Sequence, residues 1–231
     1  MEKLDLKKQL KHLYLPSAKE VSLVDVPEMK FISVDGQIEA GAMPGTSPDF
    51  ARAIGAMYGF AYTLKFMSKL RAENPIDYGV MALEGLWTTP EGGADYASGE
   101  GWMWTLMIMQ PDHVDEDMFQ QACSQLKEKA QTKARRAANK GVGAPEDDLE
   151  SALAWLDRVR LESFHEGLSV QVMHIGPYAD EPHTLARMGA FAEQNGYAFH
   201  GRHHEIYLGD PRTAKPENLK TVLRHAVHRI A

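Results

Sequence analysis

The segment of residues 204–212 constrains the fold more than any other part of the chain. It reads His-Glu-Ile-Tyr-Leu-Gly-Asp-Pro-Arg, an apolar strand that ends at a Pro-containing turn and carries one carboxylate. Because side chains alternate between the two faces of a strand, Glu205 and Tyr207 point to the same face. A carboxylate and a phenol side by side can bind a cation or act as an acid/base pair. The alternative is an edge strand whose polar face is simply hydrated.

The residues after this strand, 215–229, predict a final helix. The strand, its Asp-Pro turn and the following run Pro-Glu-Asn-Leu-Lys-Thr together resemble the C-terminal signature of the GyrI-like small-molecule-binding domain family. That family includes effector domains of multidrug-responsive transcription regulators and many stand-alone proteins. The resemblance implies that Glu205 lies in an aromatic pocket, where it meets planar, cationic ligands.

Composition limits the class of protein. The chain has 231 residues, of which 44% are hydrophobic and 25% charged, enough for one large domain or two fused halves. Its net charge of −7 argues against a nucleic-acid-binding surface and is compatible with a pocket that prefers cations. The single cysteine, Cys123, cannot form an internal disulfide, and neither a signal peptide nor a membrane-helix segment is visible. We expect a cytoplasmic protein with no nucleic-acid or membrane partner.

Strand and helix patterns follow the same order in the two halves of the chain. The first half predicts a strand ending at residues 31–36, a helix from Ser47 to about Arg71, strands at 78–87 and 102–110, and a helix at about 116–136. The second half predicts a strand at 168–175, a helix at 181–195, a hairpin about Gly201 and the final helix. A Pro-containing turn precedes a predicted helix in both halves, at Pro111 and at Pro211.

This order predicts an α+β fold. The resemblance, which covers roughly residues 20–231, implies two pseudo-symmetric strand–helix–strand–strand (SHS2) modules that form an antiparallel sheet with a ligand cleft between them. We expect an N-terminal arm at residues 1–20, anchored by Leu13, Tyr14 and Leu15. The first module spans about 21–138, a linker and helix about 139–160, and the second module about 161–231. The arm is too short for a DNA-binding helix-turn-helix, which argues against a transcription regulator.

The segments at 78–87 and 102–112 indicate a subgroup. They read Tyr-Gly-Val-Met-Ala-Leu-Glu-Gly-Leu-Trp and Trp-Met-Trp-Thr-Leu-Met-Ile-Met-Gln-Pro-Asp. They are similar to stand-alone GyrI-like proteins, some of which are cyclopropanoid cyclopropyl hydrolases that open the cyclopropane ring of DNA-alkylating natural products. The resemblance implies a detoxifying hydrolase whose ligand is a planar aromatic or cationic small molecule. Two alternatives stay open: a protein that sequesters such compounds without turnover, and a protein-partner module like the gyrase-inhibiting relatives.

Glu205 and Tyr207 are the candidate catalytic residues. A lone glutamate in an apolar strand is expensive to desolvate unless it is paired, protonated or left for a cationic ligand. In a hydrolase, Glu205 would activate or orient water, and Tyr207 would stabilise the oxygen on which charge develops. The alternatives are an ion pair of Glu205 with Arg202 or Arg212 and an ordinary half-buried strand tyrosine at position 207.

The other candidates are aromatic or acidic side chains that could line the pocket. Aromatic walls hold flat or cationic ligands by stacking and cation–π contact. We expect Glu205 to lie within a few ångströms of a tryptophan of the first half, with Glu84 facing it across the cleft. Core packing, or for Glu84 a turn-capping role, is the alternative. The candidates are Trp87, Trp104, Trp102, Glu84, Tyr178, Tyr58 and Tyr62.

The ten histidines do not predict a metal site. His203 and His204 are adjacent in a strand and face opposite ways, and no His-Glu-x-x-His motif or cysteine pair is present. A nucleophile elbow and a phosphate-binding loop are also missing from the sequence. We therefore expect no metal and no cofactor.

Overall fold

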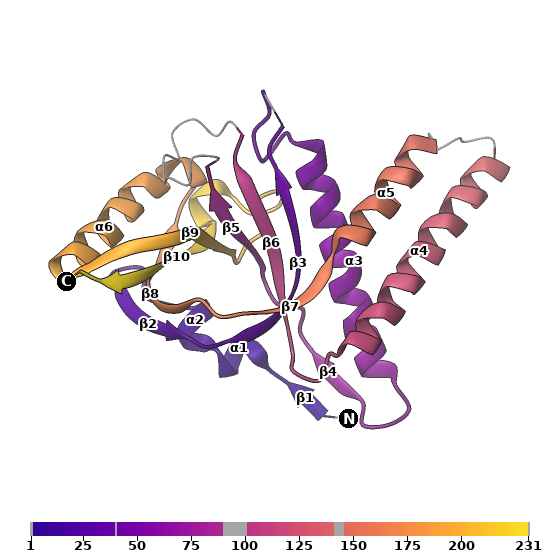
Figure 1. The fold of residues 1–231 in the computed structure, drawn as a ribbon, viewed down its shortest axis with the longest axis horizontal. Coiled ribbons are helices and arrows are strands. Elements are labelled where there is room, and N and C mark those ends of the chain that lie inside the picture. Colours follow the sequence, from indigo (N-terminus) through magenta and orange to yellow (C-terminus); the bar gives the residue numbers. More distant parts are fainter. Residues whose placement is uncertain (1, 40, 90–100, 141–145, 231) are drawn as a thin grey trace.

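A computed structural model describes residues 2–39, 41–89, 101–140 and 146–230. Its centre is an eight-stranded sheet in which all neighbouring strands are antiparallel (Figure 1). The predicted α+β class with an antiparallel sheet is confirmed. In spatial order, the strands are β2 (Ser22–Val26), β8 (Gly167–Ile175), β10 (Lys220–Arg229), β9 (Tyr197–Tyr207), β5 (Leu83–Thr88), β6 (Met103–Gln110), β3 (Met29–Gln37) and β7 (Arg160–Phe164).

The strand order is mirrored about the β9–β5 pair. One side of this pair runs β9, β10, β8 and the other β5, β6, β3. Each side follows the chain order strand, helix, strand, strand, with α3 (Pro48–Leu70) after β3 and α6 (Glu181–Gln194) after β8. The two halves therefore meet where β5 pairs with β9. The module limits proposed above stay a prediction.

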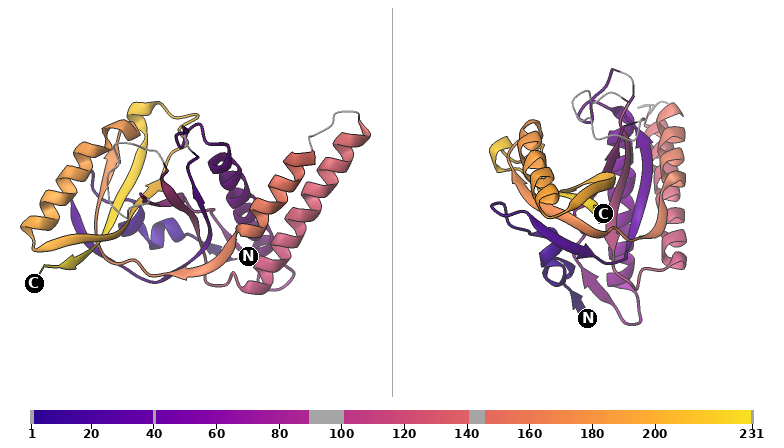
Figure 2. Two further views of the ribbon diagram at one scale, coloured as in Figure 1. Left: turned by 45° about the horizontal axis from the view of Figure 1, so that its top comes forward. Right: turned by 60° about the vertical axis from the view of Figure 1, so that its left-hand side comes forward.

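Two helices cover one face of the sheet. Phe50 of α3 packs on Trp87 and Trp104, while Thr184 of α6 bonds His174 of β8. Ser47 caps α3 by accepting from the Phe50 backbone N–H, and Pro48 stands in the first turn, as the sequence predicts. Next to α3 lie α4 (Glu116–Asn139) and α5 (Glu146–Arg158). Figure 2 shows α6 and the α3–α5 group at opposite ends of the curved sheet.

The N-terminal arm covers the opposite face. It consists of β1 (Glu2–Leu4), α1 (Leu6–Gln9) and α2 (Lys11–Tyr14), and β1 pairs in parallel with β4 (Ile76–Tyr78). Leu13 and Tyr14 are buried, as expected of anchors, but Leu15 is 52% exposed and is not one. No helix in the described part of the chain is long and apolar enough to cross a membrane.

Three local predictions are wrong. The predicted strand at 78–87 is two strands, since β4 ends at Tyr78 and β5 begins only at Leu83. The predicted final helix is the strand β10, preceded only by the short 3₁₀ helix η2 (Pro216–Asn218), so Pro211 does not lead into a helix as Pro111 does. Residues 221–227 are all buried, and a strand covered on both faces lacks the alternation that marks strands in a sequence. The predicted hairpin about Gly201 is one continuous strand, in which Gly201 has φ of 74° next to a bulge in the β9–β10 pairing.

Candidate functional site

The register of β5 and β9 decides which candidate residues share a face. Gly85 lies opposite Glu205, Leu83 opposite Tyr207 and Trp87 opposite His203. Since paired residues point to the same side of a sheet, Trp87, Glu205 and Tyr207 all lie on the face that carries α3 and α6. The sequence therefore placed Glu205 and Tyr207 correctly on one face, and the pairing adds a tryptophan from the first half.

These side chains form an acid–aromatic cluster, which we define as Trp87, Tyr178, Glu181, Glu205 and Tyr207. The Trp87 Nε1 atom donates a 2.8 Å hydrogen bond to the Tyr207 hydroxyl. The ring of Tyr178, from the 3₁₀ helix η1 (Tyr178–Asp180), meets the Tyr207 ring edge-on at 6.1 Å. The side chain of Glu205 is 13% exposed. The cluster thus joins β5, β9 and the start of α6.

The electrostatics of the cluster keep its phenols protonated. Burial and then the carboxylate of Glu205, which also bonds the hydroxyl, raise the pKa of Tyr207 well above its ordinary value. Burial, followed by Glu205 and Glu181, raises the pKa of Tyr178 to about 12. Both hydroxyls are therefore hydrogen-bond donors at neutral pH, and Tyr207 donates its single proton to Glu205 unless an oxygen of a ligand takes the place of Glu205.

The arginine partners considered for Glu205 are engaged elsewhere. Arg202 donates to the Thr105 hydroxyl at 2.6 Å, and Arg212 forms a 2.8 Å ion pair with Asp210. The Nε2 atom of His203 lies 3.3 Å from Glu205 Oε1. The alternative of an arginine ion pair therefore does not account for Glu205 among the described residues.

Glu181 was not among the residues predicted from the sequence. It is the first residue of α6 and only 6% exposed, and its Oε1 atom has no hydrogen-bond partner in the described part of the chain. Burial and the neighbouring Glu205 raise its pKa, and a hydrogen bond with Thr221 opposes this effect. A glutamate before a proline is an ordinary helix start, so the sequence carries no signal of its burial against β9.

Gly85 is the second residue that the sequence did not indicate. A Cβ atom at this position would lie 2.7 Å from Trp87 Nε1 and 3.0 Å from the Tyr207 hydroxyl. The first distance is too short for a Cβ atom and the second is tight, so a glycine fits best where the two groups bond across β5. Only the pairing of β5 with β9 reveals this requirement.

The other tryptophans extend the aromatic wall to different depths. The Trp102 ring meets the Trp87 ring at 5.7 Å and is partly buried. Trp104 is buried, stacks on Trp155 of α5 at 6.0 Å and fills the space above Gly36. Trp87 belongs to the cluster through its hydrogen bond to Tyr207, whereas Trp104 packs as a core residue.

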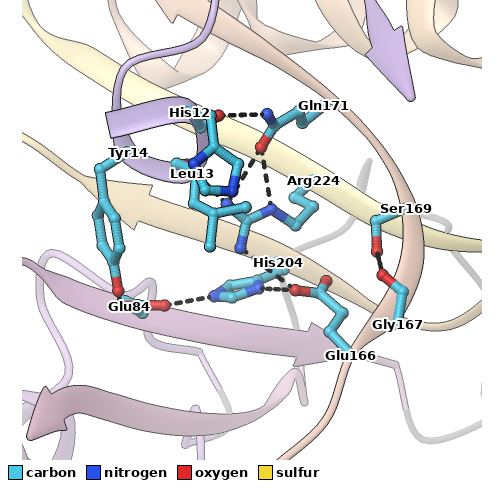
Figure 3. A network of polar contacts seen from close by, with 10 residues as sticks. All are labelled: His12, Leu13, Tyr14, Glu84, Glu166, Gly167, Ser169, Gln171, His204 and Arg224. Atoms are coloured by element: carbon cyan, nitrogen blue, oxygen red, sulfur yellow. Dashed lines mark hydrogen bonds and ion pairs between the residues drawn. The ribbon is translucent and has the colours of Figure 1, made fainter. Parts of the chain in front are cut away.

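Glu84 lies on the other face of the sheet, in a buried network drawn in Figure 3. The Tyr14 hydroxyl donates to Glu84 at 2.6 Å, and His204 bridges Glu84 at 3.0 Å and Glu166 at 2.9 Å. Arg224 adds an ion pair with Glu166 and donates to the Leu13 carbonyl oxygen of the arm. The position predicted for Glu84, across a cleft from Glu205, is wrong, because Glu84 pairs with Ile206 rather than with Glu205.

Acidic and basic side chains of the network shift one another's pKa values toward the charged forms. Its two carboxylates, hydrogen-bonded to the ring, outweigh burial and raise the pKa of His204 to about 9. Conversely, His204 and Arg224 hold the pKa of Glu166 at about 2 against the effect of burial. The arm is thus tied to a protonated histidine in β9 itself, next to Glu205 but on the opposite face of the sheet.

The two tyrosines of α3 lie at different depths. Tyr58 is partly buried and close enough to Asp210 and Arg212 for both charges to act on its pKa, which burial raises. The Tyr62 ring lies 6.3 Å from the Tyr58 ring and is half exposed. Tyr58 therefore faces the loop after β9, and Tyr62 faces outward.

Neither a metal-binding group nor the open hollow beside α6 is a better candidate than the cluster for binding a planar ligand. Within the described residues, no group of three or more His, Cys, Asp or Glu side chains could hold a metal ion. A hollow of about 480 Å³ lies between the arm and α6, but no Phe, Tyr or Trp side chain lines it. These residues are Ala18, Met173, His174, Ile175, Asp180, His183, Thr184 and Arg187. It does not offer the stacking surface that a planar ligand needs.

Comparison with known proteins places the chain in a family. A family model described as the GyrI-like small molecule binding domain matches residues 19–224. A crystal structure of an uncharacterized conserved protein from Listeria innocua is 35% identical, with a TM-score of 0.78, and covers 97% of this chain and all of that one. Two structures named as hydrolases from Listeria innocua are 33% and 35% identical, with TM-scores of 0.72 and 0.75. They cover 97% and 98% of this chain and all of their own.

No curated protein is significantly similar to the chain. The family model nevertheless spans both halves of the sheet and reaches Arg224 in its last strand. The chain belongs to the GyrI-like small-molecule-binding domain family.

Proposed function

We propose that the acid–aromatic cluster binds planar or cationic xenobiotic small molecules and hydrolyses the cyclopropyl ring of electrophilic, DNA-alkylating compounds. The observation that carries this proposal is the bonded series Trp87–Tyr207–Glu205, in which an indole, a phenol and a carboxylate adjoin one another. The indole offers a surface for a flat ring system, the phenol a donor for an oxygen and the carboxylate a base. The hydrolase names of two Listeria innocua relatives support an enzyme.

The proposed reaction uses water and a ring activated by a conjugated carbonyl group. Glu205 takes a proton from water as the water oxygen bonds to a ring methylene carbon. The ring carbon–carbon bond breaks, and its electron pair moves through the conjugated system to the carbonyl oxygen. As Glu205 becomes protonated, the Tyr207 hydroxyl turns its proton from Glu205 to that oxygen and hydrogen-bonds to it while the negative charge develops. Protonation of the oxygen completes the addition of one water molecule.

Mass spectrometry tests this proposal. The protein is incubated with a spirocyclopropyl cyclohexadienone alkylator in water and in ¹⁸O-labelled water. Hydrolysis gives a product heavier than the substrate by one water, with the label on the opened carbon, at a rate proportional to protein concentration. A product that forms equally fast without protein, or a covalent adduct on the protein in its place, contradicts hydrolysis.

Sequestration without turnover is the second candidate, favoured by the family assignment itself. In that case, the compound quenches tryptophan fluorescence, because Trp87 and Trp102 lie together at the cluster, but its mass stays unchanged. Saturable quenching with no hydrolysed product would select this candidate.

A further inference from the structure

Two carboxyl groups, not one, meet in the acid–aromatic cluster. Glu205 comes from β9 and Glu181 from the first turn of α6, and Thr221 of β10 lies beside Glu181. The side chain of Glu205 is 13% exposed, and Glu181 is 6% exposed. Two buried carboxylates in contact repel each other and are both poorly solvated, so such a pair keeps one proton between its members.

The unpartnered oxygen of Glu181 is an independent observation. Its Oε1 atom is buried and has no hydrogen-bond partner among the described residues. Folded proteins satisfy nearly all buried polar atoms, because a buried group without a partner loses its hydration without replacement. The Glu181 carboxyl group hydrogen-bonds to Glu205 and Thr221, and its Oε1 atom is left for a group that arrives with a ligand.

We propose that Glu181 is a second catalytic carboxyl group, which protonates the substrate oxygen while Glu205 removes a proton from water. This inference rests on the hydrolysis proposed above and supplies its missing proton donor. Tyr207 is poorly suited to that step, since burial and Glu205 raise its pKa and so weaken it as an acid. Tyr207 therefore holds the oxygen by a hydrogen bond, and Glu181 delivers the proton.

The protons and electrons of the cycle balance within the pair. Water loses one proton to Glu205 and bonds through oxygen to the ring carbon. The electron pair of the broken ring bond reaches the carbonyl oxygen, which takes one proton from Glu181. Transfer of a proton from Glu205 back to Glu181 restores the starting state, so the substrate gains one water and no further reactant is needed.

Other titratable groups face the pair and contribute to any pH profile. On the same face of the sheet these are His203 and Tyr207 of β9, His174 of β8 and His225 of β10. Tyr178 of η1 feels the charges of both carboxyl groups, and Asp210 after β9 acts on Tyr178 in turn. A profile of the wild-type protein alone therefore does not identify Glu181. Variants are needed that change Glu181 or its immediate partner.

The main experiment measures kcat/KM for the spirocyclopropyl substrate against pH. Glu181 must be protonated and Glu205 ionised, so the wild-type rate falls at both the acid and the alkaline end. Glu181→Gln should lower kcat/KM by roughly 10²–10³ and remove the alkaline fall, because the amide has no proton to lose. Glu193→Gln, an exposed change on the same helix, should leave the profile unaltered.

A second variant keeps both carboxyl groups. The Thr221 hydroxyl lowers the pKa of Glu181, so Thr221→Val should move the alkaline fall to higher pH without changing the fold of β10. This shift would not arise if Glu181 only supported the structure. It also tests the proposal if Glu181→Gln fails to fold.

The outcomes separate this inference from the proposed function. Hydrolysis by the wild type with an unchanged rate and profile in Glu181→Gln would overturn the role of Glu181 alone. An unmoved alkaline limb in Thr221→Val would do the same. No hydrolysis by the wild type would overturn the proposed function, and the catalytic role of Glu181 with it.

Discussion

The indole Nε1 atom of Trp87 on β5 donates a 2.8 Å hydrogen bond to the hydroxyl of Tyr207 on β9, across the junction of the two halves of the sheet. Neither half alone contains both partners. The cluster around Glu205 therefore depends on how the halves pair, and changes at this junction are expected to affect ligand binding before they unfold the protein.

Gly85 provides the first test of the junction. A methyl group there would lie 2.7 Å from Trp87 Nε1, so Gly85→Ala should displace the indole and weaken its bond to Tyr207. We expect a loss of about 1–3 kcal/mol in the free energy of unfolding. Affinity for a planar ligand, read from tryptophan fluorescence, should fall roughly tenfold, which is ~1.4 kcal/mol.

The matched control is Gly55→Ala in α3. That glycine is exposed and helical, and nothing lies within 4 Å of an added Cβ atom. The change should stabilise the protein by ~0.5–1 kcal/mol and leave ligand binding alone. Equal effects of the two substitutions would argue against a tight contact at Gly85.

The N-terminal arm is held by Tyr14. Its hydroxyl donates at 2.6 Å to Glu84, so Tyr14→Phe leaves a buried carboxylate oxygen without its donor. We expect the free energy of unfolding in urea to fall by about 1–3 kcal/mol. Tyr62→Phe, a half-exposed tyrosine of α3, should change it by less than ~0.5 kcal/mol. A Tyr14→Phe protein as stable as the wild type would show that this bond does not hold the arm.

His204 should make the protein less stable in alkali. Its pKa is about 9 in the folded state against an ordinary value of 6.5, so its contribution is complete below pH 6.5 and disappears as pH rises through 9. Between these limits, we expect the free energy of unfolding to fall by roughly 2–3 kcal/mol. His204→Gln should flatten this slope, whereas His165→Gln at an exposed position should preserve it. An equally steep slope in His204→Gln would contradict a protonated His204.

His225 should have the opposite effect in acid. Burial and the neighbouring His203 lower its pKa to about 4, so its contribution is complete above pH 6.5 and is lost as pH falls toward 4. From pH 7 to pH 5, above the range in which Glu166 titrates, we expect a loss of roughly 2 kcal/mol. His225→Phe keeps a ring to stack on Phe199 and should remove this slope. Urea unfolding at fixed pH values measures both proteins, and a retained slope would assign the acid sensitivity to another group.

The sequence predicted those features that depend on local pattern. The cap of α3 at Ser47 and Pro48 and the common face of Glu205 and Tyr207 follow from rules that reach only a few residues along the chain. The strand β10 was missed because it is buried on both faces and its polar residues do not alternate with its apolar ones, so the pattern that separates a strand from a helix is missing.

Which residues make up the site depends on how β5 pairs with β9 and how α6 packs on β9, and a single sequence does not reveal either contact. A register shift of one residue between β5 and β9 would place Glu84 opposite Glu205 on the same face, so only the alignment of Gly85 with Glu205 keeps the two carboxylates on opposite faces. Glu181 reaches Glu205 because α6 packs on β9, a tertiary contact between residues 24 positions apart. Its sequence neighbours, Asp180 and Pro182, indicate only a helix start.

The most direct test of the central claim is the effect of Glu205→Gln, which keeps the shape of the side chain and removes its charge. The account predicts that turnover of the spirocyclopropyl substrate falls by roughly a hundredfold or more, while affinity for a neutral planar ligand hardly changes. If Glu205 only attracts cations, cationic ligands weaken by about 1–3 kcal/mol and turnover is unaffected. Unchanged turnover and unchanged affinity for both kinds of ligand, with Glu193→Gln as the control, would contradict the assignment of the site to Glu205.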